Sequence, residues 1–244
     1  MEQFRSRAVT HPGTRRGHNE DMAVARPDLG LWAVADGAGG HKAGDVASEM
    51  IATTLETIPG ALNADEMLAQ VRLRIGATHA ALREHAARMG EGALVASTVV
   101  VLIVRHGHFA CLWAGDSRAY LLRDGVLQRI TRDHSLVQEM VDAGQLDEAD
   151  AEGHPRANVI TRAVGDMAET MELDKVTGRV AGGDRFLLCS DGLSKALDEA
   201  TIADLLKAGS AERAADDLLA EALARKATDN VTAVVTEVID DERV

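Results

Sequence analysis

Short acidic motifs recur along the whole length of this 244-residue sequence, and several of them follow directly on an apolar run. With Arg16 just before the first, they are Asn19-Glu20-Asp21, Asp36-Gly37, Gly115-Asp116-Ser117-Arg118, Ser190-Asp191-Gly192 and Thr228-Asp229-Asn230. Hard divalent cations such as Mg²⁺ and Mn²⁺ prefer oxygen ligands, and a two-ion cluster needs several carboxylates to offset its charge. A fold that gathers these motifs would create one metal site, and no other set of residues here could do so.

The composition is that of a globular protein with a large core and an acidic surface. Hydrophobic residues make up 46% of the sequence, and no low-complexity or linker-like segment divides it, so we expect one domain over residues 1–244. The formal net charge of -13 argues against nucleic-acid binding, which depends on clustered Lys and Arg. The partners should therefore be proteins or small molecules, with no nucleic acid and no membrane among them.

The sequence indicates a soluble cytoplasmic protein. Its first ten residues are charged and lack the apolar core of a signal peptide, and no stretch approaches the roughly 18 apolar residues of a membrane span. Cys111 and Cys189 each lie in an apolar run, where a free thiol usually packs as a small hydrophobic group. No disulfide framework is expected.

Hydrophobic periodicity predicts strands and helices in grouped runs. The expected strands span residues 30–35, 97–104, 108–114, 119–122, 184–189 and 231–238. The expected helices span residues 44–55, 63–88, 135–143, 198–206 and 211–224, the second opening on a capping box of Asn63 and Glu66. The strands between 97 and 122 are predicted to form an antiparallel meander. Such grouping favours an α+β sandwich, in which helices cover antiparallel sheets.

A single Asp-Gly pair says little about function, because it is a common turn signal. Asp124-Gly125 lies between two short apolar runs and is expected to form a type I′ hairpin turn without a catalytic role. Asp36 and Asp191 are stronger candidates than Asp124, because each follows a predicted strand and the sequence contains further acidic motifs that could join them at one site. Together with Asp116 they would lie where strands meet loops, so folding could gather them at one end of the sheets.

In this order the motifs resemble those of the PP2C-type metal-dependent serine/threonine phosphatases, and of the compact bacterial members in particular. The resemblance covers residues 5–238 and includes two segments similar to the family's flap, residues 131–135 and 154–162. The runs 10–16 and 29–32 also resemble phosphatases that reset kinase signalling in type VI secretion.

The resemblance implies a four-layer αββα sandwich with two Mn²⁺ or Mg²⁺ ions, and possible room for a third, between its two sheets. It implies that a water or hydroxide bridging the two ions attacks the phosphate directly. Carried over by motif, the metal ligands would be Glu20, Asp21, Asp36, the Gly37 carbonyl, Asp116, Asp191 and Asp229. Asp36 would bridge both ions, the Gly37 carbonyl would complete one shell, and Asp191 and Asp229 would hold the first ion. Glu20 and Asp21 would act largely through coordinated water, and Asp116 with Asp191 would form the weaker third site.

Elementary chemistry supports these roles independently. Phosphomonoester hydrolysis needs a hydroxide at neutral pH, and a metal lowers the pKa of water enough to supply one. Positioning and charge neutralisation then dominate, and the forked guanidinium of Arg16 suits both, although outside this motif Arg16 would be taken for a surface charge. Eukaryotic relatives carry a histidine after the Asp-Gly pair, where this chain has Ala38, so the general acid is unassigned; His41 is one candidate.

Rival chemistries fit less well. Neither cysteine has an arginine at the spacing of a cysteine-based phosphatase, no Gly-x-Ser-x-Gly elbow is present, and the glycines after Asp36 lack the Lys-Ser/Thr of a P-loop. Two alternatives stay open: a catalytically silent module that binds phosphoproteins or metals, and a phosphatase of small phosphate esters. We expect a phosphatase that opposes a bacterial Ser/Thr kinase and whose flap, about residues 132–165, selects the substrate.

Overall fold

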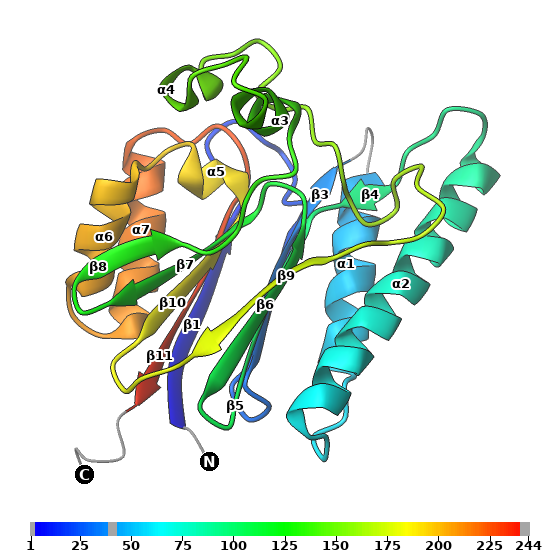
Figure 1. Ribbon diagram of the computed structural model, residues 1–244. Helices are drawn as coiled ribbons and strands as arrows, with labels where there is room; N and C mark the ends of the chain where they lie inside the picture. The colour runs from blue at the N-terminus through cyan, green and yellow to red at the C-terminus, as the bar shows by residue number, and fades with distance from the viewer. Residues whose placement is uncertain (1–2, 39–42, 240–244) are drawn as a thin grey trace.

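The structure is a computed structural model and describes residues 3–38 and 43–239. In this part of the chain two antiparallel sheets pack face to face, and helices cover the outer face of each (Figure 1). The predicted αββα sandwich is therefore confirmed.

The first sheet has the strand order β2-β3-β5-β6-β9, with β4 paired to β3. Its strands are β2 (Asp21–Arg26), β3 (Leu31–Ala38), β4 (Ala96–Ser97), β5 (Val99–Arg105), β6 (His108–Ala114) and β9 (Asp174–Arg179). The central strand β5 is buried along Val99–Val104, as its unbroken apolar run requires, because helices cover one face of this sheet and the second sheet covers the other.

The second sheet has the strand order β1-β11-β10-β7-β8. Its strands are β1 (Gln3–His11), β7 (Arg118–Arg123), β8 (Val126–Arg129), β10 (Arg185–Cys189) and β11 (Val231–Ile239). Strands β1 and β11 pair from Gln3 with Ile239 to His11 with Val231, so the two ends of the described chain lie side by side. This pairing brings the Arg16 and Asp229 motifs, which flank the two strands, to the same end of the sheet.

Helices α1 (Ala43–Glu56) and α2 (Ala64–Met89) cover the first sheet, and α6 (Glu199–Lys207) and α7 (Ala211–Ala224) cover the second (Figure 1). The capping box of Asn63 and Glu66 forms as predicted at the start of α2. Between the sheets lies an apolar layer that includes Trp32 and Phe186, both fully buried. The short helix α5 (Asp191–Ser194) follows β10 directly.

The flap, residues 132–165, leaves the second sheet after β8 and carries helices α3 (Leu136–Asp142) and α4 (Glu148–Ala151). Both helices lie beyond one end of the sheets, the end at which α5 begins (Figure 1). Ser135 caps α3, and its backbone pairs with Ile160 on the returning segment of the flap.

Two expectations about the strands were wrong. Strands 97–104, 108–114 and 119–122 do not form one meander, because the chain crosses at Gly115–Ser117 from β6 in the first sheet to β7 in the second. Strand β3 does not stop at Asp36 but continues to Ala38, because β4 supplies backbone partners for Gly37 and Ala38. As a result, Asp116 lies in the segment that joins the two sheets, and Asp36 lies within a strand, so neither is in an outer turn.

The predictions for the Asp124-Gly125 turn and for the two cysteines are confirmed. Asp124 and Gly125 have φ of 51° and 76° in the turn between β7 and β8, as a type I′ turn requires. Cys111 and Cys189 are buried free thiols. Across residues 3–38 and 43–239, no helix combines the length and apolar character that crossing a membrane would need.

Candidate metal centre

The proposed acidic ligands come from segments that the fold brings to one end of the sandwich. Asp21 begins β2 and is directly opposite Asp36 on β3. Asp191 follows β10 in the other sheet, and the Ser190 hydroxyl beside it donates a hydrogen bond of 2.8 Å to Asp21 Oδ2. One hydrogen bond thus joins the acidic motifs of both sheets.

Asn230 fixes the loop that carries the first motif. Its side-chain amide donates to the carbonyls of Pro12 and His18 at 3.0 and 2.9 Å, and its Oδ1 accepts from the Glu20 amide at 2.8 Å. Asn230 is buried, so these bonds satisfy a polar group that would otherwise be costly to bury. Arg16 and Glu20 are held beside Asp229 as a result.

Thr98 links Asp36 to the segment that crosses between the sheets. Its hydroxyl accepts from the Asp36 amide at 3.1 Å and bonds the Ser117 hydroxyl at 2.7 Å, and its amide donates to the Asp36 carbonyl at 2.8 Å. Gly115 has a φ of +108°, and a Cβ there would lie 2.6 Å from the Thr98 side chain. Only glycine therefore lets the crossing segment bring Asp116 this close to Asp36.

Gly37 is similarly constrained by its neighbours. Its amide donates to the Glu20 carbonyl at 3.1 Å, and a Cβ on Gly37 would lie 2.2 Å from the Gly44 carbonyl oxygen at the start of α1. The Asp-Gly pair here is a site of close backbone packing and not a hairpin turn. Predicted candidate His41 lies outside the described residues, and so do Gly39 and Gly40 of the same motif.

Burial and mutual repulsion perturb the carboxyl groups strongly. Burial raises the pKa of Asp21 to about 7, against hydrogen bonds from Thr232 and Ser190 that lower it. Burial, and then repulsion from Asp191, raise the pKa of Asp116 to about 7. The pKa of Asp36 is raised well above its usual value by burial and by repulsion from the other four aspartates, Asp21, Asp191, Asp116 and Asp229. The five aspartates therefore act on one another as a single cluster.

Glu20 lies at the edge of this cluster. Burial raises its pKa, and repulsion from Asp45 in the first turn of α1 and from Asp229 adds to the effect, while Arg16 opposes it. The motifs gave no sign of Asp45, because it is an ordinary acidic residue in the first turn of a helix.

Two of the aspartates are bonded to cationic side chains. Asp229 Oδ2 accepts from Arg16 Nη2 at 2.8 Å, and this bond raises the pKa of the guanidinium. Asp191 Oδ2 bonds the ammonium of Lys195, one helical turn further on. Burial, the largest single cause, lowers the pKa of Lys195, but attraction to Asp191, Asp116 and Asp36 together outweighs it and the pKa is raised. The ammonium also bonds the flap residue Asn158, at 2.7 Å between Nζ and Oδ1.

The residues fit a divalent metal by their chemistry. Within the described chain, the buried oxygens Asp21 Oδ1 and Asp116 Oδ1 have no hydrogen-bond partner. A bound cation would satisfy both oxygens and offset the burial and the repulsion that raise the three pKa values. The described side chains include no ready-made group of three His, Cys, Asp or Glu arranged to hold an ion.

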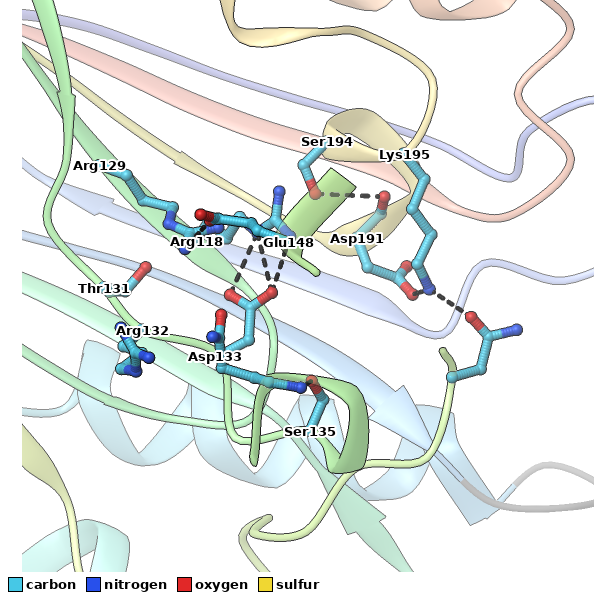
Figure 2. A network of polar contacts seen from close by, with 12 residues as sticks. Arg118, Arg129, Thr131, Arg132, Asp133, Ser135, Glu148, Asp191, Ser194 and Lys195 are labelled. Carbon is cyan, nitrogen blue, oxygen red and sulfur yellow. Dashed lines mark hydrogen bonds and ion pairs between the residues drawn. The ribbon is translucent and has the colours of Figure 1, made fainter. Parts of the chain in front are cut away.

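A cavity of about 570 Å³ opens beside the centre, between the flap and the loops that follow the second sheet. Asp116 and Asp191 line it on the side of the centre, Lys195 and Arg118 line it on the side of the second sheet, and α4 contributes Glu148. Arg118 is held by Asp133 of the flap through three bonds of 2.7 to 3.1 Å (Figure 2). The cavity is wide enough for a side chain or a phosphate group.

Three residues with a structural role in the centre were not assigned one from the sequence. Ser190 and Asn230 belong to the acidic motifs, but their bonds to Asp21 and Glu20 join segments about 170 to 210 positions apart, which no local pattern reveals. Lys195 has an i, i+4 spacing from Asp191, which could have suggested the pair.

Comparison with known proteins identifies the family. Residues 18–226 match the family described as protein phosphatase 2C. The chain is 34% identical over 237 residues to the serine/threonine protein phosphatase PstP of Mycobacterium tuberculosis, covering 97% of this chain but 45% of that protein. It therefore spans about half the length of this curated relative.

Solved structures similar to this chain support the same family. The structure of PppA, described as a key regulatory component of T6SS in Pseudomonas aeruginosa, is 42% identical with a TM-score of 0.90 and covers 97% of this chain and 98% of its own. The catalytic domain of PstP in complex with two manganese ions is 33% identical with a TM-score of 0.84, over 98% of this chain and 100% of its own. Fold, resemblance and motif order agree, and the chain belongs to the protein phosphatase 2C family.

Proposed function

We propose that the protein is a metal-dependent serine/threonine phosphatase that hydrolyses phosphoserine and phosphothreonine in other proteins. The observation that carries the proposal is the cluster of five aspartates from separate segments, in which burial and mutual repulsion raise the pKa values of Asp21, Asp36 and Asp116. A cluster this costly is expected where a protein binds divalent metals. The similarity to named serine/threonine phosphatases supports the same reaction.

The proposed ligands of Mn²⁺ or Mg²⁺ are those named from the motifs. They are Glu20, Asp21, Asp36, the Gly37 carbonyl, Asp116, Asp191 and Asp229. Bound ions of this kind lower the pKa of water, which supplies a nucleophile near neutral pH, and offset the charge of the phosphate.

Arg16 is the proposed phosphate ligand. Its side chain is 56% exposed and is anchored to Asp229 through one nitrogen, Nη2, while its other N–H groups bond no partner among the described residues. A planar guanidinium bonds two phosphate oxygens at once, which fixes the orientation of the phosphate. The Ala38 side chain has no acidic proton, so another group must protonate the leaving alkoxide. His41 is retained as a candidate for this role.

We further propose that residues 1–244 form one phosphatase domain that opposes a bacterial Ser/Thr kinase in the cytoplasm. Similarity to PppA supports a role in regulating type VI secretion. The two cysteines are free thiols, as is usual in a reducing compartment.

The direct test is hydrolysis of a phosphothreonine peptide by chelator-stripped protein, with and without added Mn²⁺ or Mg²⁺, beside the Asp36→Ala variant. Activity that returns with metal in the unmodified chain and not in the variant supports the proposal. If no metal restores activity, a catalytically silent binding module becomes the better account, and calorimetric titration with Mn²⁺ identifies it by binding without turnover. Faster hydrolysis of a small phosphate ester than of any phosphopeptide would favour the small-ester alternative.

A further inference from the structure

Lys195 is the one residue of the described chain whose side chain bonds both a proposed metal ligand and the flap. Its ammonium contacts Asp191 Oδ2 and, at 2.7 Å, Asn158 Oδ1 (Figure 2 shows the first pair). Asp191 lies at the start of α5 and Asn158 on the returning segment of the flap, so Lys195, which lines the cavity, links α5 to the flap. No sequence motif of the centre includes Lys195.

The location of Lys195 makes it a competitor for cations. Its positive charge acts on Asp116 as well as on Asp191, lowering the pKa of Asp116 against the effect of burial. Asp116 and Asp191 are the pair assigned to the weaker third metal. An ammonium bonded to one carboxylate and close to the other repels any divalent cation that approaches both.

The contact with Asn158 extends this competition to the flap. Asn158 is exposed and Lys195 is 40% exposed on its side chain, so the bond is not locked by packing and can break without opening the core. Around it the flap is fastened at other points, by the Leu136 amide to the Val159 carbonyl and by the Thr161 amide to the His134 carbonyl, each at 2.9 Å. Loss of the Lys195 bond would therefore loosen one segment of the flap and not the whole.

We propose that Lys195 is a positioning residue that acts as an internal cation: it occupies the outer side of Asp191 when no third divalent ion is bound and fastens the flap through Asn158. Binding of a divalent cation by Asp116 and Asp191 displaces the ammonium and frees the flap segment 154–160. The flap thereby responds to metal concentration. The proposal rests on the proposed metal centre, since it needs Asp191 to be a ligand.

Calorimetric titration of the full chain with Mn²⁺ tests the competition. Lys195→Met removes the charge and keeps much of the aliphatic chain, so the weakest Mn²⁺ site should bind about fivefold tighter or more, the factor that one unit charge at about 4 Å contributes even in water. Lys195→Gln should do the same, and Lys195→Arg should keep the original affinity. The matched control is Lys207→Met, which removes an equally exposed ammonium that pairs with Asp204 on α6.

Amide hydrogen exchange in the flap tests whether Mn²⁺ binding frees segment 154–160. Mn²⁺ should speed exchange of the flap amides within 154–160 in the unmodified chain. In Asn158→Ala exchange should be fast with and without Mn²⁺, and the weakest Mn²⁺ site should bind slightly tighter, though less so than in Lys195→Met, because Mn²⁺ no longer has to break the bond to Asn158. Equal Mn²⁺ affinity in the unmodified chain and both neutral Lys195 variants would overturn the proposal. These readouts do not use turnover, so an inactive protein that binds Mn²⁺ tests it equally well; a chain that binds no Mn²⁺ at all refutes the proposed function itself.

Discussion

The aspartates of the centre fall into two regions that differ in how their charge is balanced. Asp21, Asp36 and Asp116 form no ion pair in the described chain, and burial and repulsion raise the pKa of each. Asp191 and Asp229, at the rim, are bonded to Lys195 and Arg16. Only a bound cation would offset the charge of the first set, whereas the second set already has a side-chain cation. A bound cation would therefore change the charge balance of the unpaired set most, whereas at the paired set it would compete with a side-chain cation.

The largest expected effect comes from removing the most crowded member of the unpaired set. Asp36→Ala should lower metal-dependent kcat/KM on the order of 10³-fold, because a carboxylate proposed to hold both ions would contribute several kcal/mol of charge stabilisation. Initial rates on a phosphothreonine peptide at saturating Mn²⁺ measure the loss. Glu49→Ala, an exposed change on α1 away from the acidic motifs, is the control. Retention of more than a tenth of the activity would contradict the central role of the unpaired set.

A second test uses the pH dependence of the metal-free protein. The pKa of Asp21 is about 7 in the folded chain and about 3.9 in an unfolded one, so the folded state binds more protons between those values. The contribution of Asp21 to stability therefore falls as pH rises from about 4 to about 7, and the cost persists above 7. Asp116 acts in the same direction.

Asp21→Asn should remove this cost, raising the unfolding free energy of the metal-free protein at pH 8 by a few kcal/mol and far less at pH 5. Urea unfolding in the presence of a chelator measures it at both pH values. Asn keeps the side-chain oxygen that accepts from Ser190, so packing changes little. If the two proteins differ equally at both pH values, the buried carboxylate is not the cause.

The sequence predicted which aspartates belong to the centre, but not which of them are paired with a cationic side chain. The strong apolar runs of β3, β5 and β10 and the periodic helices α1, α2 and α7 were found because their patterns are local. Strand β1 was missed because charged residues interrupt it, and β9 because it is an exposed edge strand that buries almost nothing. The crossing at Gly115 was missed because strand patterns do not say which sheet a strand joins.

Local sequence patterns also limited what could be predicted about the metal centre. The motifs indicated which residues would gather, because oxygen-ligand chemistry restricts the residue types. Charge balance could not be predicted, since it depends on contacts such as Arg16 with Asp229 that join residues 213 positions apart. Only Lys195, four residues from Asp191, had a local signal.

Arg16→Ala breaks the paired set and should have a smaller effect than Asp36→Ala. Loss of hydrogen bonds to a charged phosphate should lower kcat/KM about 10- to 100-fold, mainly through KM. Steady-state kinetics with the same peptide separate KM from kcat. Arg16→Lys should recover only part of the loss, because an ammonium cannot form the two parallel bonds of a guanidinium. Unchanged KM and kcat in Arg16→Ala would remove this residue from the site.

The smallest effect is expected at the boundary between the two sets. Asp116 is unpaired, yet its partner in the proposed third site is Asp191, which is bonded to Lys195. Asp116→Ala should therefore weaken the outermost Mn²⁺ site about tenfold and leave the tighter sites occupied. Turnover should fall at limiting Mn²⁺ and recover as Mn²⁺ is raised, which a metal titration of the rate measures. Full activity at limiting Mn²⁺ would exclude Asp116 from the metal centre, whereas a loss that no Mn²⁺ concentration restores would place it with Asp36 instead.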